Sequence, residues 1–385
     1  MKGVLNIIIR EIKYILQSRL YVLAMFAFPV IDCVFLGGIY ISGNLTEIPV
    51  AVIDNDNSKI SRTIVRYIDA TPDMEVKYRL QNINELKDLF FRQKAVLGVY
   101  IPKNLQKDIK RQKQETVTLF VNSSNYITGN ITDLTSQTII ATIGGGIKYS
   151  SLTKKGVPPK QAMQLLQPVK NDGARLFNPA LNYNLYLTPG LWLSVLHQML
   201  ILVGVLTIGT EFDFKKIKTM TAAANGSLAN AFLGKMIVYM SAAYIHFEVL
   251  YRIIFPAFDI PIAHSASAAM ALSMCFAFSA ISLGFLLSAA LKTRLDALKG
   301  CLLISAPAFM MSGYTWPLDQ VPAPLKLIVQ IIPLTPFLEG FRKIYQQDLG
   351  IAFVFPFALH LIIMGMVYFS VSYAAVYLWN KKNEN

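Results

Sequence analysis

The sequence predicts a polytopic α-helical membrane protein with six transmembrane helices, both termini in the cytoplasm, an N-terminal interfacial helix and an inserted α/β domain outside. Composition is the first observation, because 54% of the 385 residues are hydrophobic, only 15% are charged and the mean hydropathy is +0.44. Soluble globular proteins have a smaller fraction of hydrophobic residues and a larger fraction of charged residues. The second observation is a set of long apolar runs, and the third is the distribution of Lys and Arg between them.

Six apolar runs are long enough to cross a bilayer. A hydrocarbon core of about 30 Å requires about 20 residues at about 1.5 Å each. The first run contains one acid, Asp32, and the fifth is the shortest and includes Pro307. We predict transmembrane helices at residues 20–41, 187–208, 236–258, 268–291, 298–314 and 351–379.

Basic residues near the ends of these runs give the expected orientation, because Lys and Arg in short loops gather on the cytoplasmic side of a membrane. In a six-span topology all of them fall on one side. Both termini are therefore expected in the cytoplasm and residues 42–186 outside, since long domains translocate regardless of charge. The flanking residues are Lys2, Arg10, Lys13, Arg19, Lys215, Lys216, Lys218, Lys235, Lys292, Arg294, Lys299, Lys381 and Lys382.

Residues 1–19 have the pattern of an interfacial helix rather than of a cleavable signal peptide. Asn6, Arg10, Lys13 and Gln17 recur at helical spacing and form a polar stripe, while leucine and isoleucine cover the other side. Such a helix lies flat on the membrane before the first span. The alternative is a longer first span that begins within this segment, which would bring these charges into lipid.

Residues 42–186 form the predicted extracytoplasmic domain, in which short β-prone runs alternate with amphipathic helical stretches. This alternation is typical of a small α/β fold. Beyond residue 124 the pattern becomes helical to about 151, and a second helix is expected near 160–167; these helices would be stalks toward the membrane. We predict strands at 49–54, 74–78, 95–101 and 116–121, and helices at 61–70, 83–93 and 102–113.

Several function classes are disfavoured by the composition. The net charge of +13 and the pI near 9.5 do not indicate a nucleic-acid-binding protein, because the cations flank the predicted spans or scatter through the outer domain. Cys33, Cys275 and Cys301 lie in or beside spans, so no disulfide framework or metal cluster is expected. With no HExxH and no GxSxG motif in the sequence, we expect neither a catalytic residue nor a metal site.

Three stretches resemble a known family. The first is PVAVIDNDNSKISRTIVRYIDATP with AVLGVYIPKNLQKDIKRQ and VTLFVNSSN, the second is LTIGTEFDFKKIKTMTAAANGSLANAFLGK, and the third is SGYTWPLDQVPAPLKLIVQIIPLTPFLEGFRKIY. Together they resemble the permease subunit of bacterial type-2 ABC (ABC-2) exporters, in the subfamily with a large extracytoplasmic insert between spans one and two. The second stretch departs from the family's usual Gly-Thr and Pro, with Lys215, Lys216 and alanines near residue 223 in their place.

The resemblance implies a permease of the bacterial cytoplasmic (inner) membrane that exports a hydrophobic or amphipathic substrate, such as a drug, a lipid or a lipid-linked compound, by alternating access. It implies a second permease, as a homodimer or a paralogous heterodimer, contact with membrane lipids, and docking of the outer domain to a periplasmic adaptor protein. The sequence has no phosphate-cradling GxxxxGKS/T motif. ATP and Mg are therefore expected in a separate ABC ATPase subunit, and this chain should hold no cofactor itself.

The loop after the second span is the expected contact for that ATPase. Glu211, Asp213 and the following lysines form a charged cytoplasmic segment, and the N-terminal helix offers Arg10 and Lys13 beside it. An ordinary basic juxtamembrane loop is the alternative. The candidate coupling residues are Arg10, Lys13, Glu211, Asp213, Lys215, Lys216 and Lys218.

Residues 316–345 are too polar and too rich in proline to form a straight span. Short re-entrant helices at the outer side of a translocation pathway would satisfy the requirement that irregular backbone at membrane depth lies against protein or water. A loop on the outer surface is the alternative. The candidate residues of this outer gate are Gly313, Trp316, Pro317, Pro322, Pro333, Pro336 and Glu339.

Ionisable residues inside spans are costly and are therefore functional candidates. Glu248 and Arg252 stand four residues apart on one helical face, where they would form a structural pair or contact a substrate. Asp32 would pack against a partner or line the pathway. His197 and His246 are isolated and are expected to be packed rather than to bind metal.

A second function remains open at this stage. The chain could be a non-transporting membrane receptor or anchor, in which the extracytoplasmic domain binds a ligand or partner and the spans only hold it in the membrane.

Overall fold

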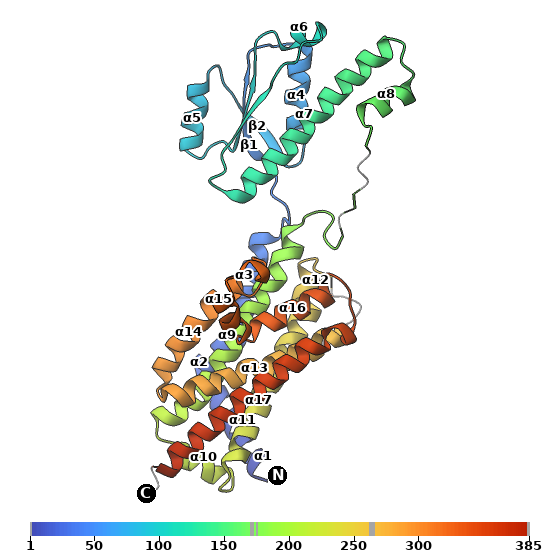
Figure 1. Cartoon of the computed structure of the whole chain (residues 1–385). Helices are drawn as coiled ribbons and strands as arrows, with labels where there is room; N and C mark the ends of the chain where they lie inside the picture. The colour runs from blue at the N-terminus through green and yellow to red at the C-terminus, as the bar shows by residue number, and fades with distance from the viewer. Residues whose placement is uncertain (1, 170–172, 175, 262–265, 383–385) are drawn as a thin grey trace. The chain divides into compact units, whose positions relative to one another are not determined.

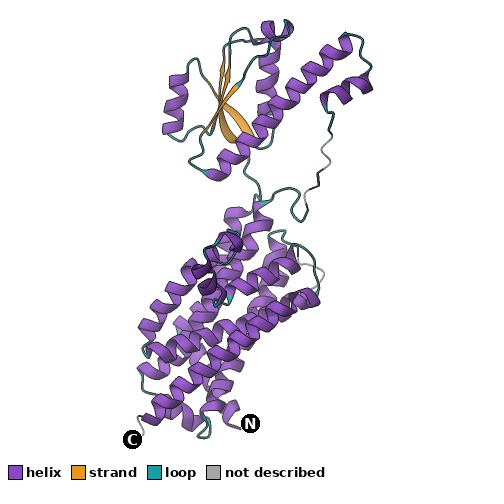
Figure 2. Cartoon of the chain, viewed as in Figure 1, coloured by secondary structure: helices purple, strands orange, loops and turns teal. Residues whose placement is uncertain are grey.

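The computed structural model describes residues 2–169, 173–174, 176–261 and 266–382. The chain divides into two compact units, one made of Met1–Gly43 with Arg175–Asn385 and the other of Asn44–Ala174. The first is helical, and the second contains the β-sheet (Figures 1 and 2). The sheet-containing unit is shorter at both ends than the predicted 42–186 domain, because Tyr183 donates its backbone N–H to the carbonyl of Gly43 at 2.7 Å within the helical unit.

The sheet has four strands in the order β2-β1-β3-β4. β1 (Ile48–Asp54) pairs in parallel with β2 (Met74–Arg79) and with β3 (Leu97–Ile101), and β4 (Thr118–Val121) pairs antiparallel with β3. These strands overlap the four stretches predicted from the sequence. The parallel pairs need crossover helices, which are α4 (Lys59–Asp69) and α5 (Ile83–Phe91).

Both faces of this sheet are covered by helices. α4 and the first half of the long helix α7 (Tyr126–Lys154) cover one face, where Val50, Val52 and Ile139 share a core. α5 covers the other face, where Leu86 packs with Ala51 and Ile53. The side chains of β1 alternate between these two cores, as the two-residue period of a strand requires. Two short helices complete the unit, α6 (Leu105–Lys110) and α8 (Pro159–Leu166).

Within the described part of the other unit, four helices are long and apolar enough to cross a membrane by length and composition. They include the predicted second, third, fourth and sixth spans. The helix at Leu228–Ala257 comprises α11 (Leu228–Val249), a short π-helical turn and α12 (Phe255–Ala257). The other three are α9 (Tyr183–Asp213), α13 (Ala266–Leu291) and α17 (Ile351–Lys382).

The other two predicted spans do not meet the same criterion. The first is divided into α2 (Arg19–Val22), a π-helical turn and α3 (Phe28–Tyr40), with an apolar helical stretch only from Met25 to Tyr40. The fifth corresponds to α14 (Arg294–Met311), an 18-residue helix whose first two turns carry Arg294, Asp296 and Lys299. Six spans therefore remain a prediction, while four are supported by length and composition.

The Pro-rich stretch after α14 forms a bent pair of helices. A 3₁₀ turn at Leu318–Gln320 leads to α15 (Ala323–Gln330), and α16 (Leu334–Tyr345) follows at 81° to α15. If the pair is one broken span, it is a fifth apolar crossing; the same geometry fits the predicted re-entrant segment.

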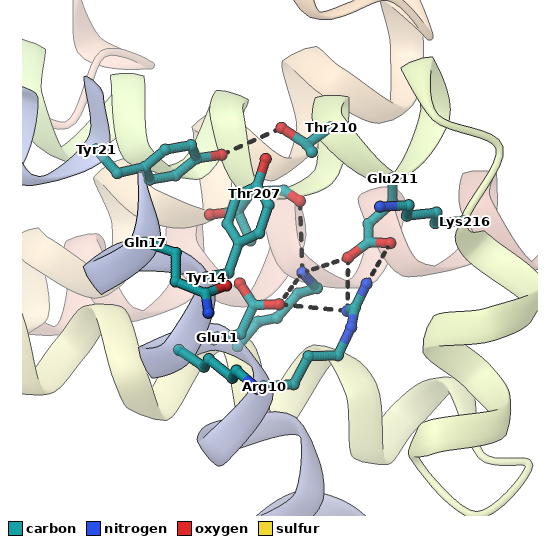
Figure 3. A pocket seen from close by; sticks show the side chains of 11 residues that line it. Arg10, Glu11, Tyr14, Gln17, Tyr21, Thr207, Thr210, Glu211 and Lys216 are labelled. Carbon is teal, nitrogen blue, oxygen red and sulfur yellow. Dashed lines mark hydrogen bonds and ion pairs between the residues drawn. The ribbon is translucent and has the colours of Figure 1, made fainter. Parts of the chain in front are cut away.

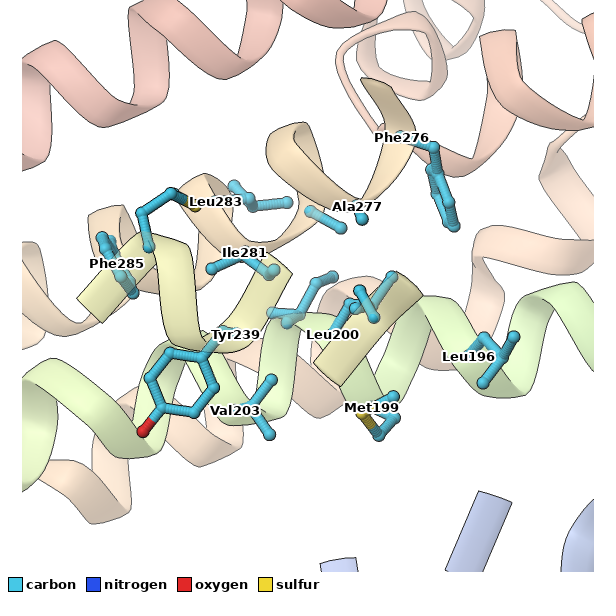
Figure 4. Close-up of a cluster of buried hydrophobic side chains, with 14 of the residues drawn as sticks. Leu196, Met199, Leu200, Val203, Tyr239, Phe276, Ala277, Ile281, Leu283 and Phe285 are labelled. Carbon is cyan, nitrogen blue, oxygen red and sulfur yellow. The ribbon is translucent and has the colours of Figure 1, made fainter. Parts of the chain in front are cut away.

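The centre of the helical unit lies between α9 and α13. A Cβ atom on Gly204 would lie 2.5 Å from the carbonyl oxygen of Ile281, and one on Gly284 would lie 2.4 Å from that of Ile201. Only glycine therefore permits the two backbones to approach this closely. Above and below this crossing the two helices interlock through apolar side chains such as Leu200 (Figure 4).

Candidate functional site

Helix α1 (Lys2–Gln17) packs against the helical unit through a narrow face. Its buried residues are Gly3, Ile7, Glu11 and Ile15, which recur every four positions. A Cβ atom on Gly3 would lie 2.4 Å from the carbonyl oxygen of Ala224, so this helix end is held close to the loop before α11. Leucine and isoleucine side chains on the opposite side stay exposed. The predicted polar stripe therefore lies beside the protein-facing side of α1, and the acid Glu11 belongs to the buried face itself.

Four charged side chains from three helices meet where α1 packs on the helical unit. We call them the charged cluster, which consists of Arg10, Glu11, Glu211 and Lys235. Arg10 makes a bidentate contact with Glu211, with Nη1–Oε1 and Nη2–Oε2 distances of 2.7 and 2.9 Å (Figure 3). Lys235 of α11 donates to Glu11 Oε1 at 2.6 Å and to Glu211 Oε1 at 3.0 Å. The cluster thus joins α1, α9 and α11.

The charges of this cluster balance in a buried setting. Lys235 and both carboxylates are at most 5% exposed, whereas Arg10 is 28% exposed. Burial disfavours the charged form of Arg10, but the hydrogen bond and the charge of Glu211 outweigh burial and raise the pKa of the guanidinium. Tyr239 adds a hydrogen bond to the second oxygen of Glu11 at 3.1 Å. Removing one member would leave an uncompensated buried charge, which is much costlier than the intact arrangement.

A polar cavity of about 200 Å³ adjoins the cluster. Tyr14, Gln17 and Tyr21 contribute to its wall from the N-terminal segment (Figure 3). The hydroxyl of Tyr21 lies 3.1 Å from Thr210 Oγ1, which links the start of the first predicted span to α9. The N-terminal segment is therefore attached to α9 at two levels, through Arg10 and through Tyr21.

The candidate coupling residues separate into three groups. Glu211 and Arg10 meet in the cluster. Asp213 instead accepts the backbone N–H of Arg294 at 3.0 Å and lies 3.5 Å from its guanidinium, so it connects the end of α9 with the start of α14. The remaining candidates do not join the cluster and are exposed at or near the protein surface: Lys13, Lys215, Lys216 and Lys218.

Glu11 was not predicted as a site residue, and Lys235 entered the prediction only as one of the cations that orient the chain in the membrane. A signal for both exists in the sequence. Glu11 occupies the same helical face as Gly3, Ile7 and Ile15, where an acid would be buried, and Lys235 stands at the edge of an apolar run. A buried acid and a buried base of this kind generally require each other.

A second cavity of about 450 Å³ lies between the start of α9, the loop after α14, and helices α15 and α16. We call it the outer cavity. Tyr186 and Tyr314 form one wall with stacked rings 5.7 Å apart, and each hydroxyl donates to the other residue's carbonyl at 2.7 and 2.6 Å. This reciprocal pair fixes the loop after α14 against α9.

The family model for the ABC-2 family transporter protein matches residues 19–374. The chain belongs to the ABC-2 transporter family.

Two relatives of this ABC-2 chain align with it along nearly their whole length. The Escherichia coli protein named probable multidrug ABC transporter permease YbhR is 21% identical over 351 residues, which cover 91% of this chain and 92% of YbhR. The Bacillus subtilis linearmycin resistance permease protein LnrN is 24% identical over 367 residues, which cover 89% of this chain and 91% of LnrN. Membership of the family implies a multi-pass membrane protein, an ABC ATPase partner and a permease dimer.

The predicted gate residues of the ABC-2 chain lie around the outer cavity or in its framework. Gly313, Pro317 and Glu339 line it, whereas Trp316 is 60% exposed and does not. Gly313 has a left-handed φ of 83°, and a Cβ atom there would lie 2.5 Å from Leu318 Cγ. The other three do not line the cavity but lie at the starts of the helices that form it. Pro322 and Pro333 directly precede α15 and α16, and Pro336 is buried in the first turn of α16.

The charged candidates in the predicted spans of the ABC-2 chain lie on exposed faces of their helices or form a local ion pair. Glu248 and Arg252 form an ion pair on the side of their helix that faces away from the protein, and Tyr244 donates to the same carboxylate at 2.7 Å. Asp32 is exposed on α3 and has no hydrogen bond or ion pair within the described residues, so it does not pack against a partner there.

Two histidines in the predicted spans of the ABC-2 chain, His197 and His246, are packed side chains. His246 contacts the carbonyl of Ala242 at 2.6 Å and that of Met25, and His197 is buried with its ring stacked 5.7 Å from Phe276. Among the residues that the structure describes, no group of three or more side chains could hold a metal ion.

Proposed function

We propose that this chain is the permease subunit of an ATP-driven exporter that moves hydrophobic or amphipathic compounds out of the cytoplasm or inner membrane. The family match over residues 19–374 carries this proposal. The relatives' names support the direction and the substrate class, because one is a multidrug permease and the other is a resistance permease for linearmycin. Resistance through a permease requires outward movement of the toxic compound.

The arrangement proposed in the membrane has six spans with both termini in the cytoplasm. α2 and α3 with their π-helical turn provide the first span and α14 the fifth, in addition to the four long apolar helices. The unit Asn44–Ala174 then lies outside the cytoplasm, where it would dock to a periplasmic adaptor. Positive charges near both ends of the chain support this orientation.

The charged cluster is the proposed link to the ATPase. The sequence contains no nucleotide-binding motif, so the work of ATP hydrolysis has to enter through cytoplasmic surfaces. The exposed lysines after Glu211 and the N-terminal helix form such a surface. Because Arg10 holds Glu211 with two hydrogen bonds, a push on the loop after α9 would move α1, α9 and α11 together. Two permease copies driven in this way would alternate between inward and outward states.

Charge reversal tests this link. The chain with its ATPase in lipid nanodiscs is expected to lose compound-stimulated ATP hydrolysis when Arg10→Glu or Glu211→Arg is introduced alone. Arg10→Lys, which keeps a positive charge opposite Glu211, should retain a substantial part of it, because the ion pair survives while the second hydrogen bond is lost. Lys2→Glu is the matched control, since Lys2 lies on the same helix, is exposed and stays outside the cluster.

Two results would count against the proposal. If all these variants, with normal folding, retain stimulated hydrolysis and export, the cluster has no coupling role. If the wild-type chain neither associates with an ATPase nor exports any compound, the non-transporting receptor becomes the better reading of the same architecture.

A further inference from the structure

An acidic side chain without a partner lines the outer cavity. Glu339 lies on α16, is partly buried, and makes no hydrogen bond or ion pair with any residue in the described part of the chain. A carboxylate near membrane depth that lacks a counter-ion is costly. The opposite face of α16 is packed into the helical core through Phe337, Leu338 and Phe341, so Glu339 is held on the cavity side.

The cations that share this cavity are already engaged elsewhere. Lys326 lies 3.4 Å from Asp319 at the rim. Arg342 follows Glu339 by three residues on the same helical face, but its Nη2 donates to the carbonyl of Gly313 at 3.3 Å and its guanidinium lies 5.6 Å from the centre of the Tyr314 ring. Glu339 therefore remains the one charged group of the cavity with no polar partner among the described residues.

The remaining walls have the chemistry of a binding site for an amphipathic molecule. A volume of about 450 Å³ falls within the usual range for small-molecule sites, about 300–1,000 Å³. The Tyr186 and Tyr314 rings and Leu318 provide aromatic and aliphatic contacts. Such walls bind an apolar body, while one placed carboxylate selects a positively charged group.

We propose that the outer cavity binds the protonated amine of an amphipathic molecule, with Glu339 as its counter-ion. The site adds a charge preference to the otherwise largely apolar walls of the exporter. This inference rests on the proposed function for its place in export, although amine binding itself requires neither the ATPase nor transport. The amine could belong to a free amphipath or to a lipid headgroup, and both would use the same carboxylate.

Binding can be measured on the purified full chain in nanodiscs of phosphatidylcholine. The probe is a dansyl-labelled long-chain amine, and the comparison ligand is the matched neutral alcohol; affinity is followed by dansyl anisotropy. Glu339→Gln keeps the shape of the side chain and removes its charge, and should weaken amine binding by about tenfold, as expected for loss of one charged hydrogen bond. Binding of the alcohol should be unchanged by the substitution.

The matched control is Glu248→Gln, the same chemical change at an acid outside the cavity that is paired with Arg252. It should leave amine affinity within twofold of the wild type. Equal amine affinity of the wild type and folded Glu339→Gln would overturn the proposal, and so would an equal loss in both variants. Adding phosphatidylethanolamine to the nanodisc identifies the source of the amine. If this lipid displaces the dansyl-labelled amine, the site is assigned to the lipid headgroup; if it does not displace the probe, the site is assigned to a free amphipath.

A second measurement locates the probe without a change at Glu339. Trp316 stands between Thr315 and Pro317, both of which line the cavity. In a Trp192→Phe background, which removes the tryptophan six residues after Tyr186 on α9, energy transfer from tryptophan to bound dansyl should therefore fall strongly on Trp316→Phe, while anisotropy still reports binding of the amine. Undiminished transfer in Trp316→Phe would place the amine elsewhere and overturn the assignment. Because no ATPase is present, failure here leaves the proposed export function standing.

Discussion

Lys235 Nζ donates to Glu11 Oε1 at 2.6 Å although 224 residues separate the two in the chain. The lysine side chain is 1% exposed, so the contact is buried and holds α1 against α11. Helix α1 of this ABC-2 chain therefore cannot leave the helical unit without exposing or unpairing both charges.

Lys235→Met should destabilise the chain strongly. It leaves Glu11 and Glu211 buried with Arg10 as their only cation, and breaking a buried ion pair in this way costs about 3–5 kcal/mol. Thermal unfolding in detergent should show a lower midpoint than the wild type. Adding Glu11→Gln to Lys235→Met should recover part of the loss, since one unpaired charge is removed. An unchanged midpoint in Lys235→Met would mean that the buried pairing contributes little.

The glycines at the crossing of α9 and α13 should tolerate no larger residue. A Cβ atom on Gly284 meets the carbonyl oxygen of Ile201 at 2.4 Å, which is backbone and cannot move aside. Gly284→Ala is therefore expected to lower the unfolding midpoint and the yield of folded protein. Gly38→Ala is the matched control, because a Cβ atom there meets nothing within 4 Å, and alanine in a helix should stabilise by about 0.5–1 kcal/mol. Equal behaviour of the two variants would contradict the close crossing.

Asp213→Asn should loosen the start of α14. The carboxylate accepts the backbone N–H of Arg294 and lies near its guanidinium, and comparable caps and exposed ion pairs contribute about 1 kcal/mol. Hydrogen exchange followed by mass spectrometry should become faster for residues 294–300. Lys216→Ala serves for comparison, because Lys216 lies in the same loop and contacts the ring of Phe214 instead. Faster exchange in both variants would point to general loosening of the loop.

Phe337→Ala should be among the most damaging core substitutions. The rings of Phe337 and Phe276 stack with centroids 3.9 Å apart and planes 6° from parallel, which joins α16 to α13. Truncating a buried phenylalanine costs about 3–5 kcal/mol, so the thermal midpoint should fall clearly. Phe353→Ala provides the contrast, since Phe353 is 61% exposed. Similar midpoints for the two variants would show that the stack does not hold α16 in place.

Local patterns in the sequence predicted much of the secondary structure. The four strands and the helices between them were readable because alternation and capping act over a few residues; Ser58 and Asn82, for example, cap α4 and α5 through their own side chains. The four longest apolar helices were equally clear. The division of residues 20–41 was not predicted, because an apolar composition does not reveal where a helix changes its winding.

The site was only partly predictable for the same reason. Arg10 and Glu211 were both recognised as charged residues near predicted cytoplasmic ends of helices, but nothing local indicated that they would contact each other. The polar stripe on residues 1–19 identified an amphipathic helix and included Arg10, which contacts Glu211. It did not include the buried Glu11, which contacts Lys235 and Tyr239. Glu339 was recognised in a Pro-rich segment, while its lack of a partner depends on where Arg342 and Lys326 direct their donors.

The sequence by itself determined that the chain is a polytopic membrane protein of the ABC-2 type with an α/β insertion, because apolar length, charge distribution and short motifs are written in consecutive residues. Only the tertiary structure decided that Glu11, Lys235, Arg10 and Glu211 form one charged cluster and that Glu339 has no counter-ion among the residues that the structure describes. Pairing energies fall off within a few ångströms, so helix packing, which brings residues hundreds of positions apart to within 3 Å, determines which charges are satisfied and which remain available for a ligand.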